Sequence, residues 1–236
     1  GDPFTNLNLE KSIANIKSRN IFKTVNSKII PGSANDLKII EIEVEEKPTG
    51  EISAGAGVGT SGGTFAFVIK ENNWLGDGKK VGIDFEINEE SLKGQLSYTD
   101  PNYDLLGNSI TYNLTNITND MPDQGYENKI LSIGAATSFE QYNNFYTRIG
   151  ATLAHDDLRT TSAASTSLKK QEGNFTEFAL DYGLTFDQRD RSFKPTDGSI
   201  IRFNQAIPAF ADKPYISNRF STSSYHTFSE NYIGSA

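Results

Sequence analysis

The 236-residue chain has no cysteine and only two histidines, His155 and His226. Without thiols it cannot build a disulfide scaffold or use a cysteine nucleophile, and it lacks the ligands of a structural zinc site. Basic residues are also few: 22 Lys and Arg stand against 30 Asp and Glu, and the net charge of −8 argues against a nucleic-acid partner. No phosphate loop, zinc motif or nucleophile elbow is present, so we expect no cofactor and no bound metal.

Long hydrophobic runs are missing as well. No stretch approaches the roughly 18 apolar residues that a transmembrane helix requires, and the mean hydropathy is −0.48. This excludes a helical membrane protein. It does not exclude a protein that crosses the membrane with strands, because a barrel strand alternates apolar with polar side chains.

Residues 1–48 indicate a small α/β unit. The pattern predicts a helix over 5–19, capped at its N-terminus by Thr5, and then strands over 23–30 and 37–45. One helix and one hairpin bury little apolar surface. We therefore expect a segment upstream of the chain to complete this unit; the alternative is that the unit packs as a cap on the rest of the chain.

Residues 49–236 alternate apolar and polar side chains in about ten runs, of which the clearest covers 175–189. Each run has roughly the 9–11 residues of a tilted membrane-spanning strand. No second helical pattern interrupts them, so the strands must be joined as antiparallel hairpins. The predicted fold is mainly β: part of an antiparallel transmembrane β-barrel, preceded by a partial α/β domain.

The face opposite the apolar residues is too polar for the packed interior of a small soluble barrel. It carries Asp84, Glu86, Gln95, Asn113, Arg148, Glu177, Asp181 and Arg202. Lipid outside and water inside explain this pattern, whereas a soluble β-sandwich that exposes these residues to solvent remains an alternative. Aromatic residues near strand ends favour interfacial girdles, namely Trp74, Tyr98, Tyr103, Phe139, Tyr142, Phe145 and Phe193.

The connections between strands differ in length on the two sides of the sheet. Compact turns are expected on one side, and long segments at 118–127 and 155–173 on the other. Bacterial outer-membrane barrels keep their short turns in the periplasm. Because residues 1–48 join the first strand at its short-turn end, we expect them to lie in the periplasm.

One connection has a distinctive composition, and we interpret it as a structured turn without catalytic residues. Its defining residues are Asp187, Arg189, Asp190, Pro195, Thr196 and Gly198. Asp156 and Asp157 form the other notable carboxylate pair, but they lie in a polar segment and are expected to be solvated charge. The sequence therefore predicts a protein that is not an enzyme.

Several segments resemble the BamA family of outer-membrane β-barrel assembly factors, in which POTRA domains precede a barrel. They are Gly50–Thr60, Gly62–Phe65, Glu71–Gly78, Tyr98–Tyr103 and Asp187–Gly198. The resemblance implies that residues 1–48 are the C-terminal part of a POTRA domain and that residues 49–236 are the N-terminal part of the barrel. It also implies that the chain is a fragment, too short to close such a barrel.

The resemblance implies a protein of the bacterial outer membrane that folds and inserts other barrel proteins there. Its partners would be unfolded outer-membrane protein clients, accessory assembly lipoproteins and outer-membrane lipid. A secretion or translocation pore that also carries POTRA domains is the alternative within the same superfamily. A soluble β-sandwich binding module is the second alternative.

Two strands are candidates for binding a client. Glycine-rich strands pair weakly, so a lateral gate is expected at Glu51, Ile52, Ser53, Ala54, Gly55, Ala56, Gly57, Val58 and Gly59. A client strand could also add to the periplasmic strand that carries Leu37, Ile39, Ile40, Ile42 and Val44. The competing explanation for the glycines is that they relieve crowding in the lumen.

Overall fold

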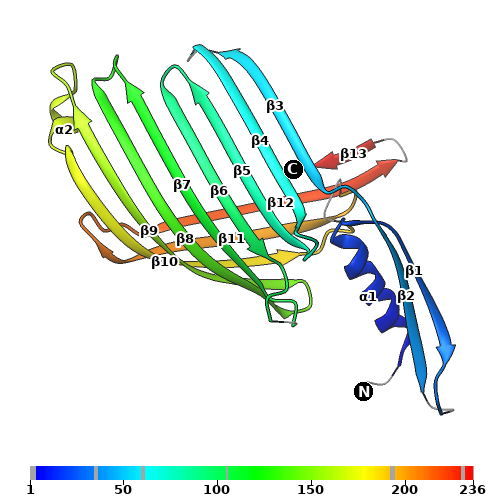
Figure 1. Ribbon diagram of the computed structural model, residues 1–236. Coiled ribbons are helices and arrows are strands. Elements are labelled where there is room, and N and C mark those ends of the chain that lie inside the picture. The colour runs from blue at the N-terminus through cyan, green and yellow to red at the C-terminus, as the bar shows by residue number, and fades with distance from the viewer. Residues whose placement is uncertain are drawn as a thin grey trace.

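The computed structural model describes residues 4–34, 37–59, 62–104, 106–191, 195–229 and 232–235. Its strands form two sheets, one of two strands and one of eleven (Figure 1). None of the helices in these residues has both the length and the apolar character needed to span a bilayer.

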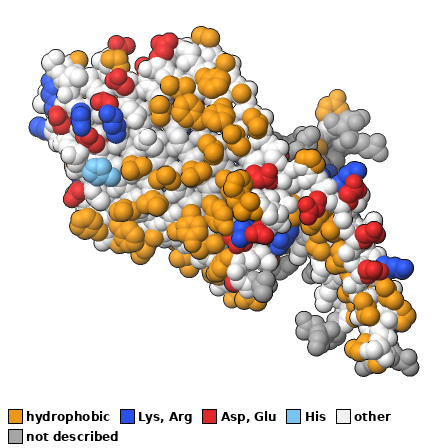
Figure 2. All heavy atoms as spheres, in the orientation of Figure 1, with side chains coloured by type: hydrophobic (Ala, Val, Ile, Leu, Met, Phe, Trp, Pro, Cys, Tyr) orange, Lys and Arg blue, Asp and Glu red, His pale blue; other side chains and the backbone are white. Residues whose placement is uncertain are grey.

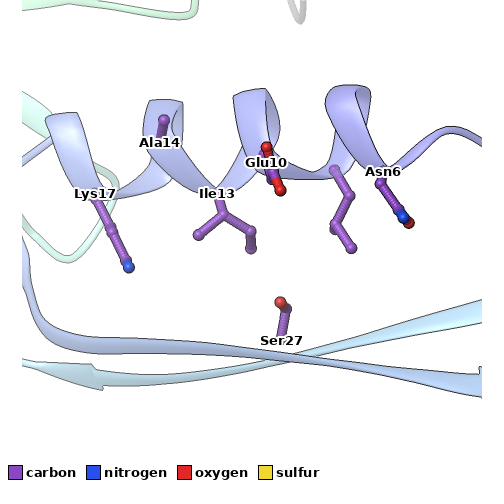
Figure 3. A pocket seen from close by; sticks show the side chains of 7 residues that line it. Asn6, Glu10, Ile13, Ala14, Lys17 and Ser27 are labelled. Atoms are coloured by element: carbon purple, nitrogen blue, oxygen red, sulfur yellow. The ribbon is translucent and has the colours of Figure 1, made fainter.

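The N-terminal unit contains one helix and one hairpin, as the sequence predicts. Helix α1 (Asn6–Ser18) follows Thr5, whose hydroxyl accepts a hydrogen bond from the Asn8 amide at 3.2 Å. Strands β1 (Phe22–Pro31) and β2 (Lys38–Glu46) pair antiparallel. A hollow of about 460 Å³ separates α1 from β1, between Ile13 and Ser27 (Figure 3). The unit therefore has only a thin core.

The large sheet is a meander in which each strand pairs with its neighbours in sequence. Its strands are β3 (Gly50–Gly59), β4 (Gly62–Trp74), β5 (Lys79–Asn88), β6 (Ser91–Asp100), β7 (Ser109–Met121), β8 (Tyr126–Tyr142), β9 (Phe145–Thr160), β10 (Gly173–Asp187), β11 (Gly198–Ala211), β12 (Ser217–Ser229) and β13 (Tyr232–Ser235). The sheet curls, so that β10–β12 pass behind β5–β8 in Figure 1. Strands β3 and β13 form its two edges.

The register of the ladder separates an apolar face from a polar face. One continuous row of paired residues is apolar across nine strands: Ile52, Ile69, Ile83, Leu96, Leu114, Ile133, Leu153, Phe178 and Phe210. The adjacent row faces the other way and is largely polar: Ser53, Val68, Asp84, Gln95, Thr115, Ser132, Ala154 and Glu177. Most side chains of the apolar row are exposed, and hydrophobic side chains gather over the outer face in Figure 2.

This arrangement matches a lipid-facing exterior and a wet interior. No second sheet packs on the large one among the described residues, so the β-sandwich alternative is wrong. Of the aromatic residues expected near strand ends, Trp74 and Tyr142 close strands β4 and β8, and Phe145 opens β9. Phe193 lies outside the described residues.

The expectation of about ten strands is confirmed by the eleven-stranded sheet, in which only the four-residue β13 was not anticipated. Two expectations about the connections are wrong. Segment 118–127 is not a long loop, since β7 continues to Met121 and β8 starts at Tyr126. Segment 155–173 begins with the end of β9 and contains the short helix α2 (Thr166–Lys169). Strands β8, β9 and β10, with 17, 16 and 15 residues, therefore exceed the expected length.

Candidate functional site

Strand β3 is an edge strand without cover on either face. All ten of its residues are exposed, and the two largest side chains, Ile52 and Val58, are 78% and 91% exposed. It pairs with β4 alone. The nine residues that the sequence assigns to a lateral gate, Glu51 to Gly59, all lie in this strand, and the N–H and C=O groups on its free side have no strand partner in the described sheet.

Three glycines of β3 require neither a special backbone conformation nor close packing within the described residues. Gly55, Gly57 and Gly59 are not among the described glycines with positive φ. A Cβ atom added at any of the three would meet no other atom within 4 Å. Among the described residues, nothing therefore presses on this side of the strand. A glycine-rich strand of this kind packs weakly and has a loosely fixed register.

Polar contacts fix the base of β3 to the connection from the N-terminal unit. The Thr49 hydroxyl donates to the Glu71 carboxylate, which also accepts the Asn73 amide at 2.7 Å. The Asn72 side chain donates to the Thr49 carbonyl at 3.2 Å. Sequence reasoning missed this anchor, although the polar run Glu71–Asn73 that ends the alternation of β4 was a visible signal. The base of the strand thus has side-chain contacts in addition to the pairing with β4 that runs along its whole length.

Strand β2 is the second exposed edge. It pairs only with β1 in the described sheet, and all nine of its residues are exposed. The five apolar residues singled out in the sequence do not share one face. Ile40, Ile42 and Val44 alternate along one face, whereas Ile39 points the other way and Leu37 precedes the strand.

The connection from β10 to β11 is a closely hydrogen-bonded turn. Arg189 forms an ion pair with Asp187 at 2.7 Å. The carboxylate of Asp190 accepts the Thr196 amide, the Thr196 hydroxyl and the Asp197 amide at 2.9, 2.7 and 3.1 Å. The hydroxyl and the two amides hold the pKa of Asp190 far below its ordinary value.

Gly198 closes this turn for a steric reason. Its φ is +92°, and an added Cβ would lie 2.2 Å from the Gln188 carbonyl oxygen. Only glycine fits such a position without moving the backbone. Residues 192–194 of this turn lie outside the described residues, and Pro195 is the first described residue after them. Every side chain described here serves the turn itself, and none points to a reacting group.

No group of three or more His, Cys, Asp or Glu side chains in the described part of the chain could hold a metal ion. The large sheet is a curled antiparallel meander (Figure 1) with an apolar outer face and a largely polar inner face. This combination is typical of transmembrane β-barrel proteins.

The comparisons identify the family. The model of the Omp85 superfamily domain matches residues 73–236, and the chain belongs to the Omp85 superfamily. It is 23% identical over 197 residues to "Outer membrane protein assembly factor BamA" from Neisseria meningitidis, covering 81% of this chain and 24% of that protein. The chain spans about a third or less of the length of the curated relatives it matches.

Two solved structures share the fold. The crystal structure of BamA from Haemophilus ducreyi lacking POTRA domains 1–3 aligns with a TM-score of 0.70 at 22% identity, over 94% of this chain and 46% of that one. CdiB from Acinetobacter baumannii aligns with a TM-score of 0.54 at 10% identity, over 96% of this chain and 45% of that one. The transmembrane-barrel fold expected from the sequence is thereby confirmed.

Proposed function

We propose that this chain is part of an assembly factor that folds and inserts β-barrel proteins into the bacterial outer membrane. Residues 49–236 supply the N-terminal part of the barrel, and residues 1–48 supply the C-terminal part of a periplasmic POTRA domain. The superfamily match and the name of the Neisseria relative support an assembly role. No catalytic residue takes part.

The observation that carries this proposal is the open, glycine-rich edge of β3. A client strand can pair with the free N–H and C=O groups of β3, and main-chain hydrogen bonds accept many different sequences. This requires that the seam, meaning the junction between β3 and the last strand of the barrel, opens without a large loss of side-chain packing. Gly55 and Gly57 meet that requirement within the described residues, because no packing partner lies beside the strand at these positions.

Strand β2 provides a second edge for unfolded clients before they reach the barrel. We assign it to periplasmic β-augmentation by Leu37, Ile39, Ile40, Ile42 and Val44, which are 40–53% exposed. The connection to β3 begins directly after β2, so both edges lie near the same end of the sheet (Figure 1). The further partners are accessory assembly lipoproteins and outer-membrane lipid around the apolar row.

A reversible lock tests the seam. In the full-length protein, Gly55→Cys is combined with a cysteine on the barrel's last strand, and client insertion into lipid vesicles is measured oxidised and reduced. We expect oxidation to abolish insertion and reduction to restore it. A matched control joins Ala135→Cys to Ala151→Cys, which already face each other across β8 and β9, and should leave insertion unchanged. Unchanged insertion with an oxidised seam would overturn the lateral-gate proposal.

A secretion or translocation pore of the same superfamily is the second candidate, supported by the shared fold with CdiB. A pore carries its substrate through the lumen and needs no open seam. The oxidised Gly55 lock separates the two functions, because it should block insertion but leave translocation of a secreted substrate intact.

A further inference from the structure

Strand β2 presents two chemically different faces beside its open edge. One face is apolar and consists of Ile40, Ile42 and Val44. Ile42 pairs with Ser27, which lines the hollow beside α1, so this face lies on the helix side of the hairpin. The other face points away from the helix and carries three carboxylates, those of Glu41, Glu43 and Glu45. All six of these strand residues are exposed, and acidic side chains recur along the N-terminal hairpin in Figure 2.

The three carboxylates are only partly compensated within the hairpin. Glu45 forms an ion pair with Lys23 at 2.8 Å. Glu41 and Glu43 form no ion pair in the described part of the chain, although Lys28 lies opposite Glu41. Side chains on one face of a strand recur about every 7 Å, and negative charges at that spacing repel one another. The acidic face of β2 is therefore complementary to positive charge from outside the hairpin.

We propose that the edge of β2 binds client segments in which apolar and basic residues alternate. The inference rests on the proposed periplasmic β-augmentation and adds a charge preference to it. A strand that pairs with β2 places its side chains beside those of β2, alternately on the two faces. Lys or Arg on one face then lies beside Glu41 and Glu43, and apolar side chains on the other face extend the row of Ile40 and Ile42.

Charge complementarity favours a basic strand over other occupants of this edge. An anionic lipid headgroup or an acidic segment would be repelled by the carboxylates of Glu41 and Glu43. A compact cationic ligand would neutralise them but would leave the N–H and C=O groups of the edge without a partner. A basic strand satisfies both, because main-chain hydrogen bonds supply affinity and opposite charges beside each other stabilise the strand pair.

Binding of two strand peptides to the full-length protein in lipid nanodiscs tests this preference. Both peptides have about ten residues and the same apolar positions, and they differ only in Lys or Gln at the alternate positions. We expect the Lys peptide to bind at least about fivefold more tightly at low salt, because it adds two cross-strand ion pairs. The ratio should approach one at about 1 M salt, which screens exposed charges. A photo-crosslinking side chain at position 42 reports whether each peptide lies at β2.

Charge-neutral variants separate the acidic face from the overall charge of the unit. Glu41→Gln combined with Glu43→Gln should reduce the ratio to less than about twofold. The matched control combines Glu10→Gln with Glu46→Gln, which removes the same charge from exposed positions on α1 and on the helix side of β2. It should retain the native ratio.

The outcomes distinguish the charge preference from the augmentation on which it rests. A native ratio near one, or equal losses in both double variants, overturns the charge preference, while crosslinking at position 42 still supports pairing at β2. If neither peptide crosslinks at position 42, the periplasmic edge does not bind strands, and the charge preference fails with it.

Discussion

Strands β3 and β9 belong to the same sheet but differ in their pairing and exposure. Strand β9 pairs with β8 and β10 along most of its 16 residues, whereas β3 pairs on one side and is exposed along its whole length. Both contain glycine, but for different reasons. A Cβ at Gly150 of β9 would lie 2.7 Å from the Ala136 Cβ, while a Cβ at Gly55 of β3 would meet nothing within 4 Å.

The difference teaches that a glycine can either permit tight packing or prevent it. Around Gly150 the chains approach so closely that Ala136 is only 6% exposed. That glycine permits the close approach of β8 and β9. At Gly55 the missing side chain leaves the strand without lateral contacts, and ladder hydrogen bonds to β4 alone hold it. We interpret the closely packed strands around Gly150 as the scaffold of the sheet. We interpret β3 around Gly55 as the part that moves.

The largest change in stability is expected from a substitution at Gly150. Gly150→Val adds a branched side chain where no space exists, and overpacking costs about 1–3 kcal/mol of unfolding free energy. Gly55→Val should leave stability unchanged or raise it slightly, since a β-branched residue favours an extended strand. Urea unfolding of the full-length protein in lipid vesicles measures both.

Client insertion supplies the second readout for this pair. The stiffer Gly55→Val seam should insert clients more slowly although the protein is fully folded. If Gly55→Val were as destabilising as Gly150→Val, β3 would be a packed strand and the contrast would disappear.

The sequence predicts the scaffold well because alternation reports contact with lipid. Every strand of the apolar row up to β10 was located, and Thr5 was recognised as the cap of α1. The strand ends were not, because outside the bilayer both faces of a strand meet water and the alternation stops. Residues 118–120 therefore continue β7 with polar side chains on both faces, although a period-two pattern no longer marks them.

The candidate site was only partly predictable. Glycine richness marks β3 from the sequence alone, but only the structure shows that the space around Gly55 is empty and that around Gly150 is full. The anchor at Thr49 joins residues 22 positions apart, so it does not follow from a local sequence pattern. The four-residue β13 is too short for any period to be recognised.

A smaller effect is expected at the turn after β10, which belongs to the scaffold. Asp190→Asn removes the negative charge that the Thr196 hydroxyl and two amides stabilise, so it should lower stability at neutral pH. The pKa of Asp190 is depressed in the folded state. Its contribution is therefore complete above the unfolded pKa of about 3.9 and is lost as the pH falls toward the folded value.

Unfolding curves for both proteins at pH 7 and at successively lower pH check this sign. The gap between native protein and Asp190→Asn should narrow below about pH 4. A gap that stayed constant with pH would show that the turn does not depend on the charge of Asp190.

The smallest change in stability is expected from removing an exposed ion pair on β8. Lys129 and Glu127 form an ion pair at 2.8 Å on β8, but their side chains are 49% and 36% exposed. Exposed pairs of this kind contribute about 1 kcal/mol or less, because water and salt screen them. Lys129→Ala should therefore change the free energy of unfolding by less than Gly150→Val, in the same urea experiment. A loss as large as that of Gly150→Val would mean that charge pairs, and not close packing of the ladder, distinguish β8 and β9 from β3.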